Sequence, residues 1–196
     1  MRKGLLLIIS GPSGAGKGTL IDRLRAEDRD LAFSVSVTTR APRPHETDGV
    51  EYRFITEAEF FALRDAGGLL ESAVVHDRYY GTPKAPIERV PAEGRDIILD
   101  IDTQGALSTM ALYPESVSVF VVPPSLAELE RRLRNRRTET EAQVEKRLTN
   151  AKAELSLMPR YQYVLLNDRL EDALAQLRAI IVAERLRTAR FLPEIL

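Results

Sequence analysis

The stretch Gly11-Pro12-Ser13-Gly14-Ala15-Gly16-Lys17-Gly18-Thr19 decides the fold. It matches the pattern G-x-x-x-x-G-K, and it follows a continuous apolar run at residues 5–9 and precedes a segment with helical spacing at residues 19–26. In a strand, loop and helix of this kind, glycines let successive backbone N–H groups point at phosphate oxygens, and the helix N-terminus adds partial positive charge. The alternative is an ordinary glycine-rich turn, which the flanking strand and helix disfavour.

Within this glycine-rich loop (residues 11–19), Lys17 brings a full charge to the β- and γ-phosphates of a nucleotide, so we expect it to act in catalysis. The next position usually carries a hydroxyl that ligates Mg²⁺, but here it is Gly18. Because Mg²⁺ readily keeps its waters, we expect it to be held through water near Asp100 or Asp102, with no direct protein ligand. The residues expected to bind ATP are Gly11, Ser13, Gly14, Ala15, Gly16, Lys17, Gly18 and Thr19.

The rest of the chain alternates buried apolar strands with helices, which predicts an α/β fold with a parallel sheet covered on both faces. After residues 5–9, such strands are expected at 97–101, 117–122 and 163–166, and later helices at 141–157 and 170–190. Residues 33–82 break this rhythm and resemble an insertion, with strands expected at 33–37, 50–54 and 69–75. Capping boxes are predicted at Thr56 with Glu59 and at Ser125 with Glu128.

Composition narrows the functional classes. The 196 residues are 44% hydrophobic and 29% charged, as in one globular domain, and the formal net charge of -1 predicts no nucleic-acid or anionic membrane partner. The absence of cysteine excludes disulfides and fits a cytoplasmic protein. The apolar N-terminus ends at Gly11-Pro12 without the longer hydrophobic region of a signal peptide. The oligomeric state does not follow from the sequence.

The segment Thr38-Thr39-Arg40-Ala41-Pro42-Arg43 places two arginines three positions apart. Arginine forks bind phosphate bidentately, although surface arginines are more often only solvated. Further motifs follow in the order Asp48-Gly49-Val50-Glu51-Tyr52, Tyr79-Tyr80-Gly81-Thr82 and Asp100-Ile101-Asp102-Thr103-Gln104-Gly105.

Together, T-T-R-x-P-R, D-G-x-x-Y, Y-Y-G-T and D-I-D-x-Q-G resemble the guanylate kinase family over essentially the whole chain. The resemblance implies a three-layer P-loop nucleoside-monophosphate-kinase fold that transfers the γ-phosphate of ATP to GMP by in-line displacement with Mg²⁺. It implies a core at residues 1–32, 84–125 and 151–196, an inserted mainly-β GMP-binding lobe at 33–83 and a helical lid at 126–150.

The resemblance also assigns the acceptor site. It gives the GMP phosphate to Arg40, Arg43, Tyr52 and Tyr80, and the guanine base to Ser36, Glu71, Thr82 and Asp100. From the residues alone, the tyrosines can be ordinary half-buried aromatics and Glu71 a charge at a sheet edge. A carboxylate such as Asp100, directly after a buried strand, is well placed to face a ligand, but its role and that of Asp102 stay unseparated.

Residues 126–137 contain five arginines, a composition typical either of a solvated helix face or of a phosphate clamp. The resemblance implies that Arg132, Arg136 and Arg147 act in catalysis with Lys17 and Arg40. It places Asn167 near the adenine of ATP, and a helix cap before Leu170 is the alternative.

Three competing functions remain. Guanylate kinase-like domains of scaffold proteins bind phosphopeptides without catalysis, but they typically lose the glycine-rich loop that is intact here. A kinase of a phosphorylated ribose resembles the family at that loop, and Ser36, Glu71 and Thr82 favour guanine instead. A GTPase is disfavoured by Gly18 and by the lack of an N-K-x-D sequence.

Overall fold

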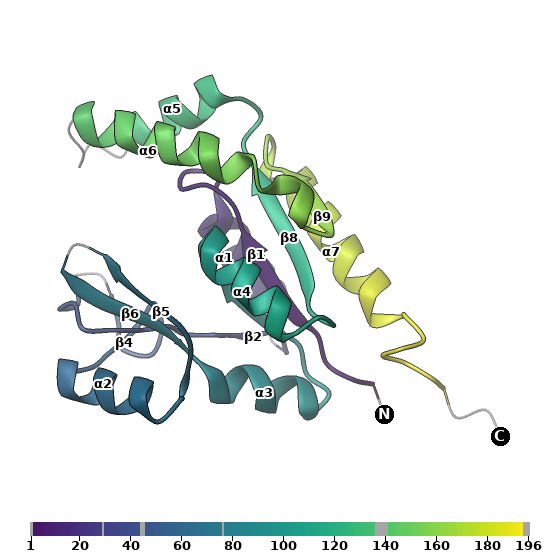
Figure 1. Cartoon of the computed structure of the whole chain (residues 1–196). Helices are drawn as coiled ribbons and strands as arrows, with labels where there is room; N and C mark the ends of the chain where they lie inside the picture. Colours follow the sequence, from purple (N-terminus) through teal and green to yellow (C-terminus); the bar gives the residue numbers. More distant parts are fainter. Residues whose placement is uncertain (1, 29, 44–45, 76, 136–140, 194–196) are drawn as a thin grey trace.

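The computed structural model describes residues 2–28, 30–43, 46–75, 77–135 and 141–193 (Figure 1). Its central sheet has the strand order β2-β7-β1-β8-β9, and every neighbouring pair is parallel. The strands are β1 (Leu6–Ser10), β2 (Ala32–Phe33), β7 (Ile97–Asp100), β8 (Val117–Val122) and β9 (Tyr163–Leu166). Parallel neighbours need crossover connections, so helices lie over the sheet.

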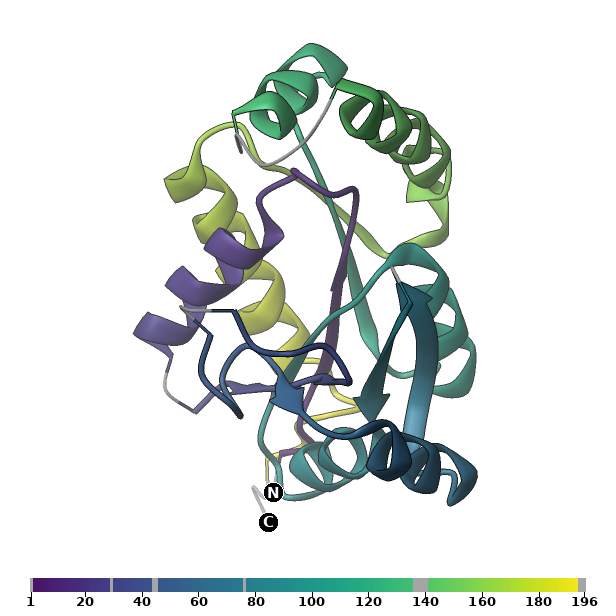
Figure 2. The same ribbon diagram turned by 90° about the vertical axis from the view of Figure 1, so that its left-hand side faces the viewer.

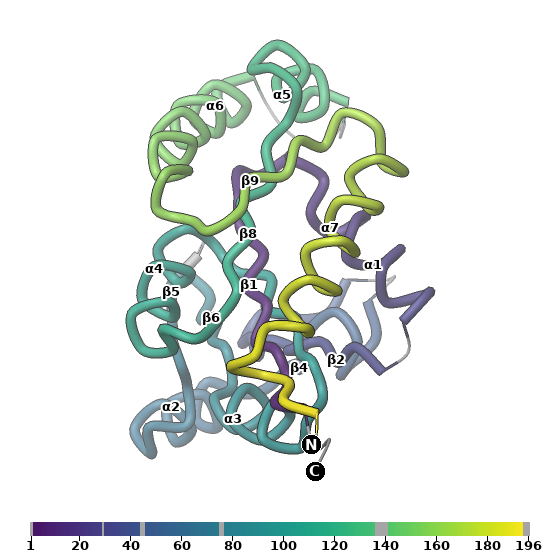
Figure 3. The backbone as a smooth tube through the Cα atoms, turned by 90° about the vertical axis from the view of Figure 1, so that its right-hand side faces the viewer, coloured from purple at the N-terminus to yellow at the C-terminus, as the bar shows by residue number. Residues whose placement is uncertain are grey.

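Helices cover both faces of this sheet (Figures 1 and 3). Side chains alternate along β1, so that Leu7 and Ile9 pack into one buried cluster and Leu6 and Ile8 into another. The first cluster includes α1 (Lys17–Glu27) and α7 (Leu170–Arg185), and the second includes α3 (Lys84–Ala92) and α4 (Thr103–Leu112). The expected three-layer α/β core is therefore confirmed.

Two further parts flank the core. A second sheet has the order β4-β3-β6-β5 and carries α2 (Glu57–Asp65) beside it (Figure 2). Its strands are β3 (Val37–Thr38), β4 (Arg53–Phe54), β5 (Leu69–Val75) and β6 (Arg78–Pro83). At the other side, α5 (Leu126–Arg134) and α6 (Glu141–Leu155) pack together through buried Leu129, Leu133 and Val144.

The structure corrects several expected elements. The single strand expected at residues 33–37 is wrong: Phe33 pairs with β7 in the central sheet, whereas Val37 pairs with β4 and β6 in the second sheet. The chain crosses between the sheets at residues 34–36. The strand expected at 50–54 shrinks to Arg53–Phe54 because a turn precedes it, in which Val50 N–H donates to the Thr47 carbonyl.

Two helices were not expected from the pattern. The helix α3 contains Pro91, which normally argues against a helix, and α4 contains Gly105 in its first turn. The expected closing helix at 170–190 ends at Arg185, and the helix expected at 141–157 ends at Leu155.

The capping predictions have different outcomes. Thr56 and Glu59 form the reciprocal box at the start of α2. The Ser125 hydroxyl accepts from the Glu128 backbone N–H at 3.0 Å, as expected, but the Glu128 carboxylate accepts hydrogen bonds from Arg131 and Arg132.

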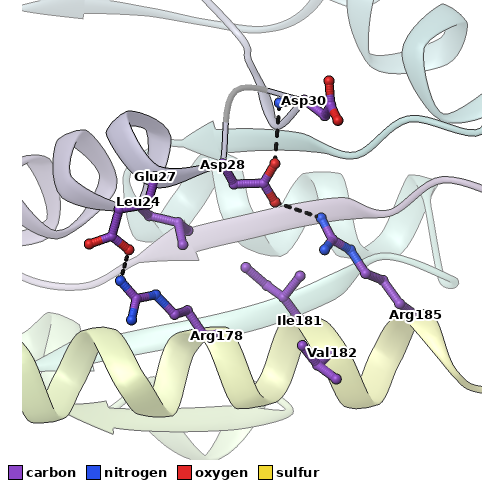
Figure 4. Close-up of a pocket in the computed structure, with 8 residues that line it drawn as sticks. All are labelled: Leu24, Glu27, Asp28, Asp30, Arg178, Ile181, Val182 and Arg185. Atoms are coloured by element: carbon purple, nitrogen blue, oxygen red, sulfur yellow. Dashed lines mark hydrogen bonds and ion pairs between the residues drawn. The ribbon is translucent and has the colours of Figure 1, made fainter.

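A surface groove of about 500 Å³ separates α1 from α7 at the end of α1 away from the glycine-rich loop (Figure 4). Arg178 pairs with Glu27 across it, and Arg185 pairs with Asp28 at 2.9 Å. Arg185 also reaches the buried Asp96 at 2.7 Å. These ion pairs hold α7 against α1 and the central sheet, so we assign the residues of the groove a structural role. In the described part of the chain, no helix combines the length and apolarity needed to cross a membrane.

Candidate functional site

The glycine-rich loop is held in a conformation that glycine favours. Gly11, Gly14 and Gly16 have positive φ angles of 134°, 90° and 90°. At Gly11 a Cβ would lie 2.2 Å from the Val121 carbonyl oxygen, so no side chain fits there. Gly16 is the N-cap of α1 and no side chain caps it, so the first N–H groups of the helix are available to an anion.

Two side chains reach over this loop. The Lys17 ammonium donates to the Gly11 carbonyl at 2.6 Å, which places its charge above the loop. The Asn167 side-chain amide donates to the Ala15 carbonyl at 2.8 Å and is buried beside Gly16. Because the N-cap of α7 is Arg169, the helix-cap alternative for Asn167 is wrong. Asn167 instead braces the loop from the end of β9.

Two glycines of the loop provide a matched test. Gly16→Ala would put a Cβ 2.3 Å from the Asn167 amide nitrogen at a φ of 90°, and a left-handed residue costs about 1–2 kcal/mol. We expect the KM for ATP to rise about tenfold, because the strain disturbs the loop. Gly18 has no atom within 4 Å of a Cβ, so Gly18→Ala should leave the KM for ATP within about twofold and keep or raise the melting temperature, since Ala suits a helix better by ~0.5–1 kcal/mol. Steady-state kinetics that show equal effects for both variants would contradict this account.

An arginine–tyrosine cluster lies in the second sheet. The Arg40 guanidinium donates through Nε to the Tyr80 hydroxyl at 3.2 Å and lies 5.5 Å from the Tyr52 ring centroid. Tyr52 and Tyr80 meet edge to face at 5.7 Å. The sequence places these three residues far apart, and the fold brings them together. Arg43 is different, because its side chain is 73% exposed.

Glu46 belongs to this cluster although the sequence analysis missed it. Its carboxylate accepts from Arg40 Nη2 at 2.8 Å and from the Arg43 backbone N–H at 2.8 Å, and it lies 4.0 Å from Arg43 Nη1. The Arg40 hydrogen bond is the main cause that lowers the pKa of Glu46. An acidic residue three positions after the second arginine was the available signal. The Glu46 carboxylate therefore marks a position from which a negatively charged group contacts both Arg40 and Arg43.

Glu71 and Thr82 form a second polar group on β5 and β6. The Thr82 hydroxyl donates to Glu71 Oε1 at 2.5 Å, and Thr82 is fully buried. Burial raises the pKa of Glu71, the Thr82 hydrogen bond partly offsets this, and the charge of Asp102 adds to the rise. Glu71 therefore faces the core through α4, whose Gly105 would place a Cβ 3.5 Å from the Glu71 side chain. Glu71 thus lies on the edge strand β5 but is half-buried there.

Asp100 and Asp102 have different roles in the structure. Asp102 is the N-cap of α4 and accepts from the Gly105 N–H at 2.8 Å. Asp100 ends β7 and lines a cavity with Ser36 and Tyr52. Burial raises the pKa of Asp100, while the charge of Lys17 lowers it. Asp100 thus lies within electrostatic reach of both the glycine-rich loop and the cluster in the second sheet.

Two arginines of the α5–α6 segment contact the glycine-rich loop or its brace. Arg132 donates to the Asn167 carbonyl at 3.1 Å, and Arg147 donates to the Ser13 hydroxyl at 3.3 Å. Glu128 orients Arg132 at 2.8 Å, and its bonds to Arg131 and Arg132 lower the pKa of Glu128 to about 2. Arg136 lies outside the described residues.

A lysine-bearing phosphate loop between strand and helix, faced by arginines and by a polar second sheet, defines the class of P-loop phosphoryl-transfer kinases. The comparisons narrow this class. The family model "Guanylate kinase" matches residues 3–184. The chain is 50% identical to a guanylate kinase of Cereibacter sphaeroides over 96% of this chain and 90% of the relative, and 46% identical to one of Caldanaerobacter subterraneus over 96% and 92%.

A solved structure agrees. The crystal structure of guanylate kinase from Anaplasma phagocytophilum matches with a TM-score of 0.79 and 34% identity, covering 97% of this chain and 90% of that one. The chain belongs to the guanylate kinase family.

Proposed function

We propose that this chain transfers the γ-phosphate of ATP to GMP, giving ADP and GDP, with Mg²⁺ and in the cytoplasm. The reaction follows from its membership of a family of phosphoryl-transfer kinases. The observation that best supports GMP as acceptor is the partly buried Glu71–Thr82 pair, with its carboxylate and hydroxyl side by side. Guanine presents two donors beside one acceptor, which such a pair complements.

The donor side is the glycine-rich loop. Its backbone N–H groups and the N-terminus of α1 surround the β-phosphate, and Lys17 moves from the Gly11 carbonyl to the β- and γ-phosphate oxygens. We assign ATP binding to Gly11, Ser13, Gly14, Ala15, Gly16, Lys17, Gly18, Thr19 and Asn167. The contact of Asn167 with Ala15 supports its part as the brace that holds the loop ready.

The acceptor side is the polar face of the second sheet. Arg40, Tyr52 and Tyr80 already form one cluster, and we assign the GMP phosphate to them and to Arg43. Phosphate takes over the Arg40 contact that Glu46 makes here. The base is assigned to Ser36, Glu71, Thr82 and Asp100.

Arginines of the α5–α6 segment neutralise the negative charge on the phosphoryl group during its transfer. Arg147 lies on Ser13 and Arg132 on the backbone of Asn167, so both already border the donor loop. We propose that they and Arg136 stabilise the in-line transition state, in which charge spreads over the equatorial oxygens. Residues 126–150 then act as a lid, residues 33–83 as the GMP-binding lobe, and residues 1–32, 84–125 and 151–196 as the core.

The residues around Lys17 fit Mg²⁺ held through water. Gly18 has no side chain and no atom lies within 4 Å of its Cβ position, which leaves room for waters. In the described part of the chain, no group of three acidic or histidine side chains is placed to hold a metal. The carboxylates that feel the charge of Lys17 are Asp100 and Glu154, and Asp102 in turn acts on Glu154. Bound with ATP, Mg²⁺ supplies charge neutralisation on the β- and γ-phosphates.

The test is ADP release, coupled to a spectroscopic reporter, with ATP and each of GMP, AMP, CMP, UMP and ribose 1,5-bisphosphate. We expect GMP to exceed the other acceptors in kcat/KM by at least about 10³-fold, because unpaired polar groups reject the wrong base. EDTA should abolish turnover, and Mg²⁺ should restore it. Preference for the ribose bisphosphate would replace the proposed function, and activity undiminished by EDTA would remove Mg²⁺ from it.

A further inference from the structure

We propose that Ser34 is a further residue of the acceptor site, and that its hydroxyl hydrogen-bonds a ribose hydroxyl of the bound nucleotide. The inference rests on the proposed function. It concerns a residue at the crossing between the two sheets, where the backbone N–H of Ser34 donates to the Ile98 carbonyl at 2.8 Å.

The Ser34 hydroxyl is buried without a partner. The residue is 2% exposed, and its Oγ has no hydrogen bond to any described residue. A buried hydroxyl that lacks a partner costs free energy, so its presence needs an explanation. The backbone bond to Ile98 does not require a hydroxyl, because any residue can make it. A ligand that supplies the missing partner is such an explanation.

Ser34 lines a cavity of about 230 Å³ that already contains part of the acceptor site. The same cavity is lined by Ser36 and Asp100, which we assign to the base, and by Tyr52, which we assign to the phosphate. In a nucleotide the sugar joins the base to the phosphate. A cavity bordered by residues for both ends is therefore the place of the sugar.

The charges around the cavity favour hydroxyl groups over phosphate. Asp22, Glu51 and Asp100 line it, and Arg25 is the basic residue among its lining, stacked 4.7 Å above the Phe33 ring. Carboxylates accept hydrogen bonds from sugar hydroxyls and repel a phosphate. A serine hydroxyl both donates and accepts, so it can bond a sugar hydroxyl that itself donates to a carboxylate.

The experiment combines Ser34→Ala with removal of single hydroxyls from GMP. We expect Ser34→Ala to lower kcat/KM for GMP about three- to tenfold, the loss of one neutral hydrogen bond. Either 2′-deoxy-GMP or 3′-deoxy-GMP, whichever lacks the bonded hydroxyl, should show the same kcat/KM with wild type and variant. The melting temperature of the free variant should be unchanged or higher, because no partner is lost.

Ser72→Ala is the matched control, an exposed serine on β5 of the second sheet, and it should leave all three substrates unaffected. An unchanged kcat/KM for GMP in Ser34→Ala would overturn the proposal. An equal loss of kcat/KM for GMP and both deoxy analogues would also overturn it, with or without a lower melting temperature. A role of Ser34 in packing alone predicts such an equal loss. A wild-type enzyme that fails to phosphorylate GMP would instead overturn the proposed function, and this inference with it.

Discussion

Replacing Lys17 by alanine is expected to lower kcat by roughly a thousandfold or more, because a preorganised positive charge is removed from the transferring phosphoryl group. In the structure the Lys17 ammonium lies over the loop, bonded to the Gly11 carbonyl at 2.6 Å. That bond is only partly buried, so its loss should cost little folding free energy. We therefore expect the fold to persist, with a melting temperature within a few degrees of wild type.

The measurement is ADP release at saturating ATP and GMP, with circular dichroism as the check on folding. Lys152→Ala is the control, because Lys152 is an exposed lysine on α6 and its removal changes the net charge equally. A Lys17→Ala variant that turns over GMP at a near wild-type rate would show that the glycine-rich loop does not hold the reacting phosphates.

The second large effect is expected for Glu71→Gln, which should cost about 2–4 kcal/mol in kcat/KM for GMP. The Glu71 carboxylate accepts from Thr82 through one oxygen at 2.5 Å and can accept the adjacent N1–H and N2–H donors of guanine. A glutamine side chain has only one acceptor oxygen, so its NH₂ group would face one of the two guanine N–H donors. Discrimination against AMP should narrow, because the carboxylate no longer opposes the N1 lone pair of adenine. The KM for ATP should stay unchanged.

Stability and pH dependence provide independent readouts for Glu71. Burial raises its pKa, so the folded protein holds this proton at a higher pH than the unfolded chain does. At a pH above the pKa of Glu71 in the folded protein, its ionised carboxylate therefore lowers the stability of the fold. Glu71→Gln removes this charge, so it should keep or raise the melting temperature at neutral pH. For the same reason, kcat/KM for GMP should fall on acidification at a higher pH than an ordinary glutamate would give, and this limb should vanish in the variant.

Glu57→Gln is the control, an exposed glutamate on α2 in the same part of the molecule. Intact GMP kinetics in Glu71→Gln would mean that Glu71 does not contact the base. Equal damage to the KM values of ATP and GMP would indicate a structural role for the Glu71–Thr82 pair.

The sequence alone determined the parts of this protein that depend on neighbouring residues. The glycine-rich loop needs positive φ angles at Gly11, Gly14 and Gly16, and glycines at these nearby positions between strand and helix allow them. The strands Leu69–Val75 and Val117–Val122 were also predicted correctly, since the side chains that decide them are consecutive. The order of motifs along the chain was enough to indicate the family.

Only the tertiary structure decided which distant groups meet. Arg147 contacts Ser13 across 134 positions, and Asn167 holds Ala15 across 152. The capping role of Asp102 follows from where α4 begins, a helix that the pattern did not reveal, whereas Asp100 ends β7 and lines a cavity. The strand expected at residues 33–37 divides between two sheets, because Phe33 pairs with β7 and Val37 pairs with β6. The packing of remote segments decides which strands pair, which side chains are buried and which hydroxyls, such as that of Ser34, lack a hydrogen-bond partner. Local periodicity in the sequence carries no information about that packing.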